Sequence, residues 1–413
     1  MSFLKNLFTR RSPKRRLDLS SGRKINVAIE LDTFDKGGLQ KVVLDSALRL
    51  DPEKFDVTIV SVKGGGHWAD VARTAGIAVF SLDDPRGKSY KEILIERNID
   101  LACSHFSRTG YPLFKELGIP NITFIHNVYA FLPGSALKNF KADDRYVDRY
   151  ISVSNNATNY AALRLGIDPT KIVTIPNGLI LQEHDERSKS IENIDRADFG
   201  ISNNDYLFLN VASYNLHKGH YLMADAMKKI LKVRSDIKIL CIGNVIYPPH
   251  ITAFSAYLKD NNLESHILMP GYFPHIEAFH QMSDAFLLPS FIEGWSIAMN
   301  EAMYYEKPMI LTDTGGSSEV IHNNDIGILI PNEYGHTTNL YCELLDQLAY
   351  ERREYSITDK LVDAMINFSD NRDYWRGAGQ RGREKLLLNY NFDSVVQKYE
   401  NIFLKVLSQG ADN

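Results

Sequence analysis

Two carboxylates, Glu293 and Glu301, flank a short segment that is suited to binding an anion. Between them the strand-like run AFLLPS leads through Gly294-Trp295-Ser296 into a helical pattern, with Ser296 as the expected N-cap. The free amides at a helix start, together with the helix dipole, favour a phosphate group. Carboxylate oxygens accept hydrogen bonds from the vicinal hydroxyls of a sugar or a ribose. The segment could therefore hold a polyol–phosphate–polyol ligand, although a solvated acid beside an ordinary capped helix has the same pattern.

A second loop in the same half of the chain offers positive charge. In VASYNLHKG, residues 211–219, a strand pattern runs through a loop into a helix and places Lys218 near the helix start, where its ammonium group could meet a diphosphate. Two more strand-end loops, PSFIEG and TDTGGSSEV, follow along the chain. Ligands of open α/β sheets bind at the carboxyl ends of the strands, so these loops are expected to converge on one site.

The elements that must position these loops are two alternating series of strands and helices. Short β-branched runs from KINVAIEL to KIVTIP predict a first, largely parallel and buried sheet, and a second series runs from DYLFLNVAS to IGILIP. Helical patterns such as 40–50 and 90–97 lie between the strands. Two consecutive series predict an α/β chain of two doubly wound, Rossmann-like domains with a ligand cleft between them.

The patterns along the chain also predict where its parts begin and end. Pro176-Asn177-Gly178 is a turn signal, and the polar segment LQEHDERSKSIENIDRADFG that follows shows no apolar period. Its acidic EHDE cluster is therefore expected in a solvated loop rather than in a metal site. The pattern of apolar residues after 391 predicts an amphipathic closing helix that packs back on the first domain. The expected parts are a basic segment at 1–23, a first domain at 24–180, a linker at 181–204, a second domain at 205–390 and the closing helix at 391–413.

The first residues, MSFLKNLFTRRSPKRR, combine apolar side chains with concentrated positive charge. No acidic residue precedes Asp18. Residues 1–16 therefore suit an anionic membrane surface, to which each basic residue adds about 1 kcal/mol, or they form a solvated tail. The apolar residues that fall on one face at helical spacing are Phe3, Leu4, Leu7 and Phe8.

The bulk properties exclude several other classes of protein. The 413 residues carry a formal charge of −4, which predicts no nucleic-acid binding. The 3 cysteines form no CxxC pair, which excludes a disulfide framework or a zinc ribbon and fits a reducing, cytoplasmic compartment. No apolar run approaches the ~18 residues of a membrane span. No Asp-x-Asp motif occurs, so a metal–diphosphate clamp has no candidate residues.

The order of these motifs resembles the retaining glycosyltransferases of family four, the group 1 glycosyl transferases. The resemblance rests on Lys218-Gly, then PSFIEG, then a second glutamate after seven intervening residues, and then Asp-Thr-Gly-Gly. In the first half, FDKGGLQKVV is similar to the family's glycine loop, FIHN carries a histidine where the family has one near the donor sugar, and IPNGLI is similar to its interdomain turn. The resemblance implies the GT-B fold, in which two Rossmann-like domains face a deep interdomain cleft.

The resemblance also implies a role for each matched residue. Glu301 would hold the ribose of a nucleotide sugar, Glu293 the sugar hydroxyls, and Lys218 would neutralise the leaving diphosphate. Gly38 would let the first domain approach that diphosphate, and His126 would orient the donor sugar. His126, Lys218 and Glu293 are thus the expected catalytic residues, with no metal or other cofactor. The expected donor site comprises Gly37, Gly38, Ser213, Lys218, Glu293, Gly294, Trp295, Ser296, Ile297 and Glu301.

Ser213 departs from the family pattern, which has an arginine five residues before the lysine. Loss of one charge-assisted hydrogen bond costs roughly 1.5–3 kcal/mol. Three consequences are open: His217 compensates, the donor binds differently, or turnover is weak. A smaller departure is Gln40, where the family often has glutamate.

The expected function is transfer of a sugar from a nucleotide sugar to a saccharide or a lipid-linked saccharide, the latter at the cytoplasmic face of a membrane. The alternatives are another GT-B activity, such as a sugar-nucleotide epimerase or a phosphorylase, and a nucleotide-sugar-binding protein without activity. A dinucleotide fingerprint at Gly64, Gly66 and Ala69, with Asp83 downstream, is weaker than the interpretation of these glycines as a turn. Four aromatic residues of the first half suit either sugar stacking or core packing: Phe106, Tyr111, Tyr129 and Phe131.

Overall fold

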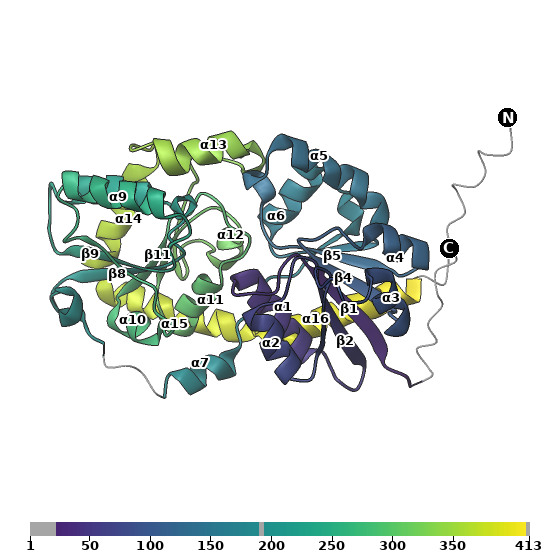
Figure 1. Cartoon of the computed structure of the whole chain (residues 1–413). Helices are drawn as coiled ribbons and strands as arrows, with labels where there is room; N and C mark the ends of the chain where they lie inside the picture. Colours follow the sequence, from purple (N-terminus) through teal and green to yellow (C-terminus); the bar gives the residue numbers. More distant parts are fainter. Residues whose placement is uncertain (1–21, 190–193, 410–413) are drawn as a thin grey trace.

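The chain folds into two parallel β-sheets, each covered by helices (Figure 1). The computed structural model describes residues 22–189 and 194–409, so the predicted membrane contact of residues 1–16 lies outside the described residues. The first sheet has seven strands in the order β3-β2-β1-β4-β5-β6-β7, and the second has six in the order β10-β9-β8-β11-β12-β13. The predicted α/β fold with two doubly wound, parallel sheets is therefore confirmed.

The strands fall where the β-branched runs predict them. β4 and β5 are buried at every position, because helices cover both faces of a parallel sheet. The strands of the first sheet are β1 (Ile25–Leu31), β2 (Phe55–Ser61), β3 (Ala78–Ser81), β4 (Leu101–His105), β5 (Asn121–Ile125), β6 (Arg149–Ser152) and β7 (Ile172–Thr174). Those of the second are β8 (Tyr206–Val211), β9 (Ile237–Ile242), β10 (Ile267–Gly271), β11 (Ala285–Leu288), β12 (Met309–Thr312) and β13 (Gly327–Ile330).

The helices alternate with the strands in both domains. Those up to the second sheet are α1 (Gly38–Arg49), α2 (His67–Thr74), α3 (Tyr90–Glu96), α4 (Tyr111–Leu117), α5 (Gly134–Asp143), α6 (Asn155–Tyr160) and α7 (Leu181–Arg187). The later ones are α8 (His220–Ile230), α9 (Pro248–Asp260), α10 (Glu277–Met282), α11 (Ile297–Tyr304), α12 (Ser317–Val320), α13 (Cys342–Asp346), α14 (Thr358–Asp370), α15 (Arg372–Asn389) and α16 (Phe392–Gln409).

The strand order reverses at one point in each sheet, between β1 and β4 and between β8 and β11. The loops that leave neighbouring strands at such a point run to opposite sides, which opens a crevice at the carboxyl edge. The loops after β1 and β4 contain Gly37 and Phe106, and those after β8 and β11 contain Lys218 and Glu293. The topology therefore brings the predicted site loops to the two crevices.

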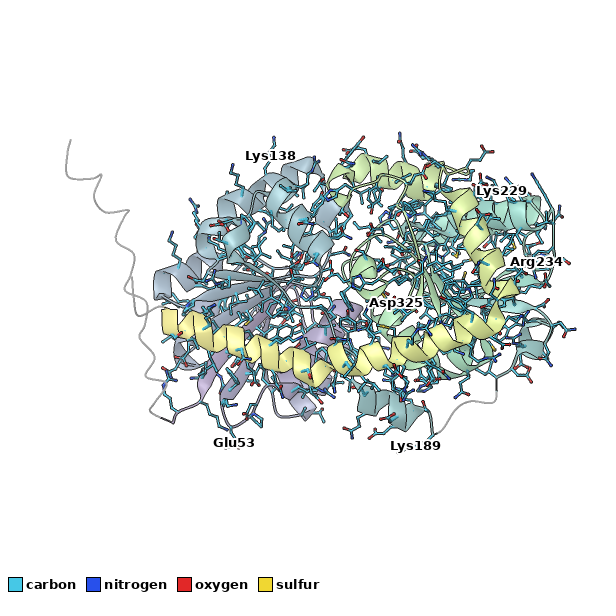
Figure 2. The ribbon with its side chains drawn as sticks, turned by 180° about the vertical axis from the view of Figure 1, so that it is seen from behind. Glu53, Lys138, Lys189, Lys229, Arg234 and Asp325 are labelled. Carbon is cyan, nitrogen blue, oxygen red and sulfur yellow. The ribbon has the colours of Figure 1, made fainter. Side chains whose placement is uncertain are left out.

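The chain crosses between the domains a second time before α16. Figure 2, which views the molecule from behind, shows α15 and α16 (yellow) following one another across both domains, in front of the sheets in this view. Val395 and Tyr399 belong to the same apolar cluster as Val27 of β1, so the last helix packs on the first sheet. The two crossings touch: a Cβ atom built on Gly178 would lie 2.6 Å from the Cα atom of Phe392. This contact requires glycine in the predicted Pro-Asn-Gly turn.

The polar segment after that turn is more ordered than its composition predicts. Its first part is the helix α7, at the bottom of Figure 1 between the domains. His184 is only 4% exposed, and its ring lies 5.3 Å from that of Tyr304. The prediction of a solvated loop for the EHDE cluster is therefore wrong. The contacts of α7 are mostly polar, such as the 3.1 Å ion pair between Glu183 and Lys41 of α1. The sequence of this helix therefore lacks the apolar periodicity from which a helix could be predicted.

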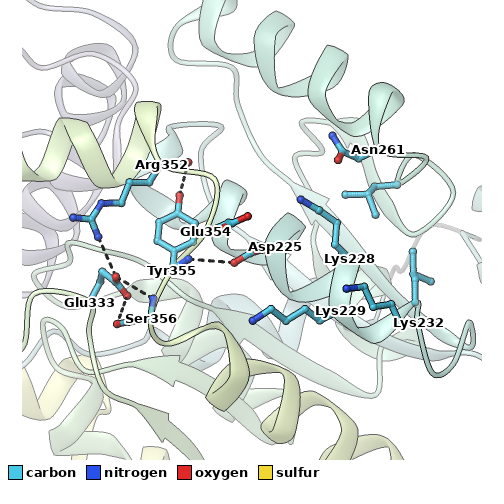
Figure 3. Close-up of a pocket in the computed structure, with 12 residues that line it drawn as sticks. Asp225, Lys228, Lys229, Lys232, Asn261, Glu333, Arg352, Glu354, Tyr355 and Ser356 are labelled. Carbon is cyan, nitrogen blue, oxygen red and sulfur yellow. Dashed lines mark hydrogen bonds and ion pairs between the residues drawn. The ribbon is translucent and has the colours of Figure 1, made fainter.

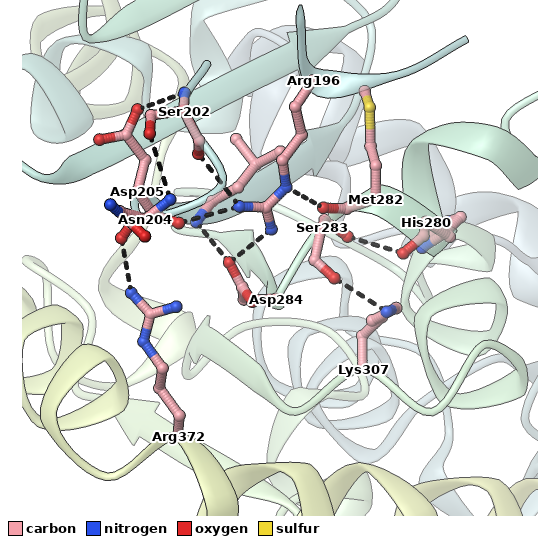
Figure 4. Close-up of polar contacts among 11 residues, drawn as sticks. Arg196, Ser202, Asn204, Asp205, His280, Met282, Ser283, Asp284, Lys307 and Arg372 are labelled. Atoms are coloured by element: carbon pink, nitrogen blue, oxygen red, sulfur yellow. Dashed lines mark hydrogen bonds and ion pairs between the residues drawn. The ribbon is translucent and has the colours of Figure 1, made fainter.

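Arg196 anchors the second part of the same segment to the second domain (Figure 4). Its guanidinium donates to the carbonyl oxygens of Met282, at 2.8 Å, and Asp205, at 2.9 Å. It also forms a 2.8 Å ion pair with Asp284, whose carboxylate accepts a further hydrogen bond from the backbone of Leu207 in β8. The segment is thus held to the first strand of the second sheet.

Candidate active site

A cavity of about 500 Å³ lies between the two domains. The first domain lines it with the start of α1 and the segment after β5, and the second domain with Lys218 and the turn before α11. Of the predicted site residues, the structure brings together here Gly38, His126, Lys218, Glu293, Gly294, Trp295, Ser296 and Ile297.

Lys218 and Glu293 are in direct contact at this cavity. The Nζ atom of Lys218 lies 2.7 Å from Oε1 of Glu293, which also accepts a hydrogen bond from Ser290 Oγ at 2.8 Å. Gly219 has φ of 79°, and a Cβ atom there would lie 2.1 Å from the carbonyl oxygen of Pro289. The loops after β8 and β11 therefore pack against each other at a glycine, and this packing fixes the ion pair.

The start of α11 lies at the interdomain cavity. Ser296 is the N-cap, as predicted, and its Oγ accepts a hydrogen bond from the backbone of Met299 at 3.3 Å. Trp295 is buried, and its Nε1 donates to Asn300 Oδ1 at 3.1 Å. The side chain of Asn300 donates in turn to the carbonyl oxygen of Asn177 at 3.0 Å, which ties the helix to the interdomain turn. The indole is therefore a packing element, while the helix start faces the cavity.

The two domains are in close contact at Gly294. A Cβ atom built there would lie 1.9 Å from the carbonyl oxygen of His126, so any side chain would push the domains apart. On the opposite wall, Gly38 also lines the cavity, and a Cβ atom there would meet nothing within 4 Å. Gly294 is thus required by packing, whereas the space beside Gly38 is free for a ligand.

His126 is paired with a second histidine that the sequence did not single out. Its Nε2 lies 2.8 Å from Nδ1 of His105, at the end of β4, so one ring donates a hydrogen bond to the other. Burial lowers the pKa of His126 to about 4 and lowers the pKa of His105 as well, so both rings are neutral at pH 7. The His105 ring stacks on Phe124 with 4.2 Å between centroids. The sequence feature that could have predicted this pair is a histidine at the end of β4 and another directly after the neighbouring strand β5.

Glu301 lies outside the lining of the cavity, in a second polar cluster behind α11. Burial raises its pKa to about 7, against a lowering influence of Arg187, while Glu277 raises it further. His184 of α7 is nearby, with 4.0 Å between its Nε2 and Oε1 of Glu301, and burial lowers the pKa of this histidine to about 4. The helix that the sequence did not predict therefore faces the predicted ribose carboxylate.

Gly37 and Ser213 also lie outside the cavity lining. A Cβ atom on Gly37 would meet the side chain of Gln40 at 2.2 Å, and the carbonyl oxygen of Ser213 accepts a hydrogen bond from the backbone of Asn215 at 2.6 Å. His217, one of the open replacements for the family arginine, lies 3.1 Å from Tyr350 Oη through its Nε2. The imidazole thus has a partner within its own domain.

Three of the four aromatic residues that the sequence analysis named in the first half of the chain line the cavity. Tyr129, Phe106 and Phe131 line the cavity, whereas Tyr111 is buried and its Oη lies 2.7 Å from Thr123 Oγ1. At the rival glycine motif, the backbone N–H of His67 donates to Asp35 at 2.9 Å, which agrees with a packed turn. The lining residues that the sequence analysis missed are Leu39, Val42, Asn127 and Asn177.

A larger cavity, of about 770 Å³, lies within the second domain (Figure 3). Three lysines line it, and two of its cations are in ion pairs: Lys229 pairs with Asp359 at 2.7 Å and Arg352 with Glu333 at 3.1 Å. It shares no lining residue with the interdomain cavity. Among residues 22–189 and 194–409, no group of three or more histidine, cysteine and acidic side chains is arranged to hold a metal ion. The smaller cavity between the two domains is therefore the better candidate for the active site.

Comparison with known proteins assigns the family. Residues 191–345 match the family described as glycosyl transferases group 1, and residues 36–183 match that described as glycosyltransferase family 4. The chain belongs to the group 1 glycosyltransferases of the GT-B fold. This family assignment confirms the resemblance seen in the motifs around Lys218 and Glu293. It also covers both walls of the interdomain cavity.

Some relatives of this glycosyltransferase chain are distant in sequence but extend over most of its length. It is 22% identical to the UDP-Gal:alpha-D-GlcNAc-diphosphoundecaprenol alpha-1,3-galactosyltransferase of Escherichia coli, over 90% of this chain and 94% of that protein. A glycosyltransferase structure from Rickettsia africae superposes with a TM-score of 0.73 at 19% identity, covering 93% of this chain and 99% of that one. Anabaena HepE in complex with UDP gives a TM-score of 0.72 at 13% identity, covering 92% and 100%.

Proposed function

We propose that this glycosyltransferase moves a sugar from a nucleotide-diphosphate sugar to a saccharide or lipid-linked saccharide, with retention of anomeric configuration and without a metal ion. The observation that carries the proposal is the contact between Lys218 and Glu293 at the start of α11, inside a cavity built by both domains. A cation, a helix N-terminus and a carboxylate for hydroxyl groups match the three parts of such a donor.

In this mechanism the protein positions and stabilises rather than forming a covalent bond. The acceptor hydroxyl oxygen bonds to the anomeric carbon while the bond from that carbon to the diphosphate breaks, and the acceptor proton passes to the leaving phosphate. Lys218 and the first amides of α11 stabilise the charge that develops on the diphosphate. Glu293 accepts hydrogen bonds from the donor sugar, and the neutral His126 orients it. Glu301 is proposed to hold the ribose from behind α11.

UDP is the first donor fragment to test, because the similar Anabaena HepE was crystallised with UDP. A panel of nucleoside diphosphates and their sugars should raise the melting temperature only for the nucleotide that binds. Incubation of the matching nucleotide sugar with acceptor saccharides should then give a glycoside. Binding without any glycoside would favour the binding-protein alternative, to which the uncharged Ser213 lends weight. A free sugar phosphate or an isomerised nucleotide sugar would favour a phosphorylase or an epimerase.

The acceptor and the location belong to the same proposal. The Escherichia coli relative is named for a diphosphoundecaprenol-linked acceptor, which suits action at the cytoplasmic face of a membrane. No helix in the part of the chain that the structure describes is long and apolar enough to cross a membrane. We propose contact through residues 1–16. Deletion of these residues should move the protein out of the membrane fraction, and an unchanged distribution would contradict this contact.

A further inference from the structure

The first domain contains a cavity of about 460 Å³ that the donor site does not use. We call it the Phe106 cavity. It shares Phe106 and Tyr129 with the interdomain cavity, so the two spaces adjoin at one aromatic wall. A molecule in the Phe106 cavity would therefore end beside the proposed donor sugar.

The walls of the Phe106 cavity suit an apolar group better than a sugar. Phe106, Leu132, Phe140 and Ile167 have no polar side-chain atom, and they line it together with Phe124 and Ile125. A saccharide needs unpaired donors and acceptors, because burying hydroxyls without partners is costly. Three of the hydroxyls here already have partners: Tyr111 Oη lies 2.7 Å from Thr123 Oγ1, and Tyr129 Oη accepts from the backbone of His126 at 3.2 Å.

Phe106 marks the entrance from the donor side. Its side chain is 43% exposed, and its φ of 55° is in the left-handed region, which a bulky residue adopts only when its surroundings impose it. Such strain is concentrated at ligand sites. The ring lies 5.5 Å from that of Tyr129 and 6.4 Å from that of Phe131. This exposed aromatic group can stack on a sugar ring at the boundary between the cavities.

Arg108 adds one accessible cation to the same space. Its guanidinium lies 4.8 Å from the Phe140 ring centroid, and one nitrogen is 3.0 Å from Asp143. The side chain is 35% exposed, and a guanidinium has further N–H donors that suit a phosphate. Lys63, the other cation of the lining, is paired with Asp32 at 2.9 Å. Apolar walls with an arginine fit a ligand that is both hydrophobic and anionic.

We infer that the Phe106 cavity is the acceptor site and that it selects a saccharide linked through a diphosphate to an isoprenoid lipid. The inference rests on the proposed function. The acceptor sugar stacks on Phe106 at the shared wall, Arg108 binds the diphosphate, and the first isoprenoid units enter the apolar part of the cavity.

Calorimetric titration of the full-length protein with farnesyl diphosphate tests this site. Saturating UDP is present, so that the donor diphosphate site is filled. Farnesyl diphosphate should bind at least about tenfold more tightly than inorganic diphosphate, because only the former carries the apolar chain. Phe106→Ala and Arg108→Gln should each weaken it by about tenfold or more. Arg108 does not line the interdomain cavity, so Arg108→Gln should leave UDP binding unchanged. The matched controls are Tyr272→Ala and Arg376→Ala, an exposed tyrosine and an exposed arginine of the second domain; neither should change the affinity.

Each contrary result overturns the inference in a different way. UDP binding without farnesyl diphosphate binding leaves the proposed function intact and removes the lipid acceptor. Equal affinity for inorganic diphosphate contradicts selection by the apolar walls. Loss of farnesyl diphosphate binding on deletion of residues 1–16, with Phe106→Ala unaffected, places the lipid on the basic segment instead. Failure to bind any nucleotide diphosphate refutes the proposed function itself.

Discussion

The Nζ atom of Lys218 lies 2.7 Å from Oε1 of Glu293, where the loops after β8 and β11 meet. Glu293 is 8% exposed and has a second partner in Ser290. The carboxylate is thus held by two donors, and the ammonium group is held at the cavity next to the start of α11. The protein alone thus holds side by side a positive charge and a carboxylate that can accept hydrogen bonds from hydroxyl groups.

Replacement of Lys218 by alanine should lower kcat by about 10²-fold or more, because the leaving diphosphate loses its cation. The measurement is product formation from the nucleotide sugar identified by the binding panel. Lys229→Ala is the matched control, since Lys229 forms an ion pair of the same length with Asp359 on the surface of the same domain. A kcat within about threefold of the wild type in Lys218→Ala would remove the lysine from the mechanism.

His105→Phe should lower both stability and activity. The ring of His126 would lose its buried hydrogen-bond partner, which costs about 1–3 kcal/mol, and would no longer be oriented. His105→Asn, which restores a donor and an acceptor, should recover part of the activity. His280→Phe is the matched control: this buried imidazole has no hydrogen-bond partner among the described residues and stacks on Tyr305, so the change should not lower the melting temperature. Equal losses in both phenylalanine variants would contradict the special role of the His105–His126 pair.

Glu301→Gln should stabilise the protein at alkaline pH. Burial raises the pKa of Glu301 from 4.5 to about 7, so the folded state binds a proton that the unfolded state has lost. The contribution of this carboxyl group to the free energy of unfolding is therefore complete below about pH 4.5. It is lost as the pH rises through about 7, and the loss amounts to up to about 3 kcal/mol. The glutamine variant escapes this loss.

Melting temperatures at about pH 5 and about pH 8 measure the effect. The variant should gain stability over the wild type at the higher pH and show a smaller difference at the lower one. Glu53→Gln, at an exposed glutamate, is the matched control. A difference between Glu301→Gln and the wild type that is independent of pH would mean that this carboxyl group titrates normally.

Arg196→Ala should destabilise the second domain, because Asp284 and two carbonyl groups lose their donor. The expected loss is about 2 kcal/mol, or roughly 4–8 °C in melting temperature. Arg376→Ala removes an exposed ion pair on α15 and should have almost no effect. If the two variants melt alike, the segment around Arg196 is not an anchor of the fold.

The sequence was most informative where one short segment carries the whole signal. The β-branched runs define both sheets, and the strand–loop–helix patterns around Lys218 and Ser296 place both residues at the interdomain cavity. These features depend on neighbours along the chain. The burial of His184 and the pairing of His105 with His126 depend instead on contacts between distant segments, mostly polar, and no periodic pattern records them.

The position of Glu301 shows the same limit within the site. Its spacing from Glu293 matches the family, yet its side chain lies in a cluster with His184 and Arg187 of α7. The polar composition of this segment did not predict a helix. A motif predicts which residues share a loop or a helix. Which side of that helix faces the cavity is decided by the packing of the domains.

The most direct test is a crystal structure of the protein with UDP, or with whichever nucleoside diphosphate raises its melting temperature. We predict that the diphosphate lies between Lys218 Nζ and the backbone amides at Ser296 and Ile297, with the ribose toward Glu301. A diphosphate bound instead at the lysine-lined cavity of Figure 3, or elsewhere outside the interdomain cavity, would contradict the account.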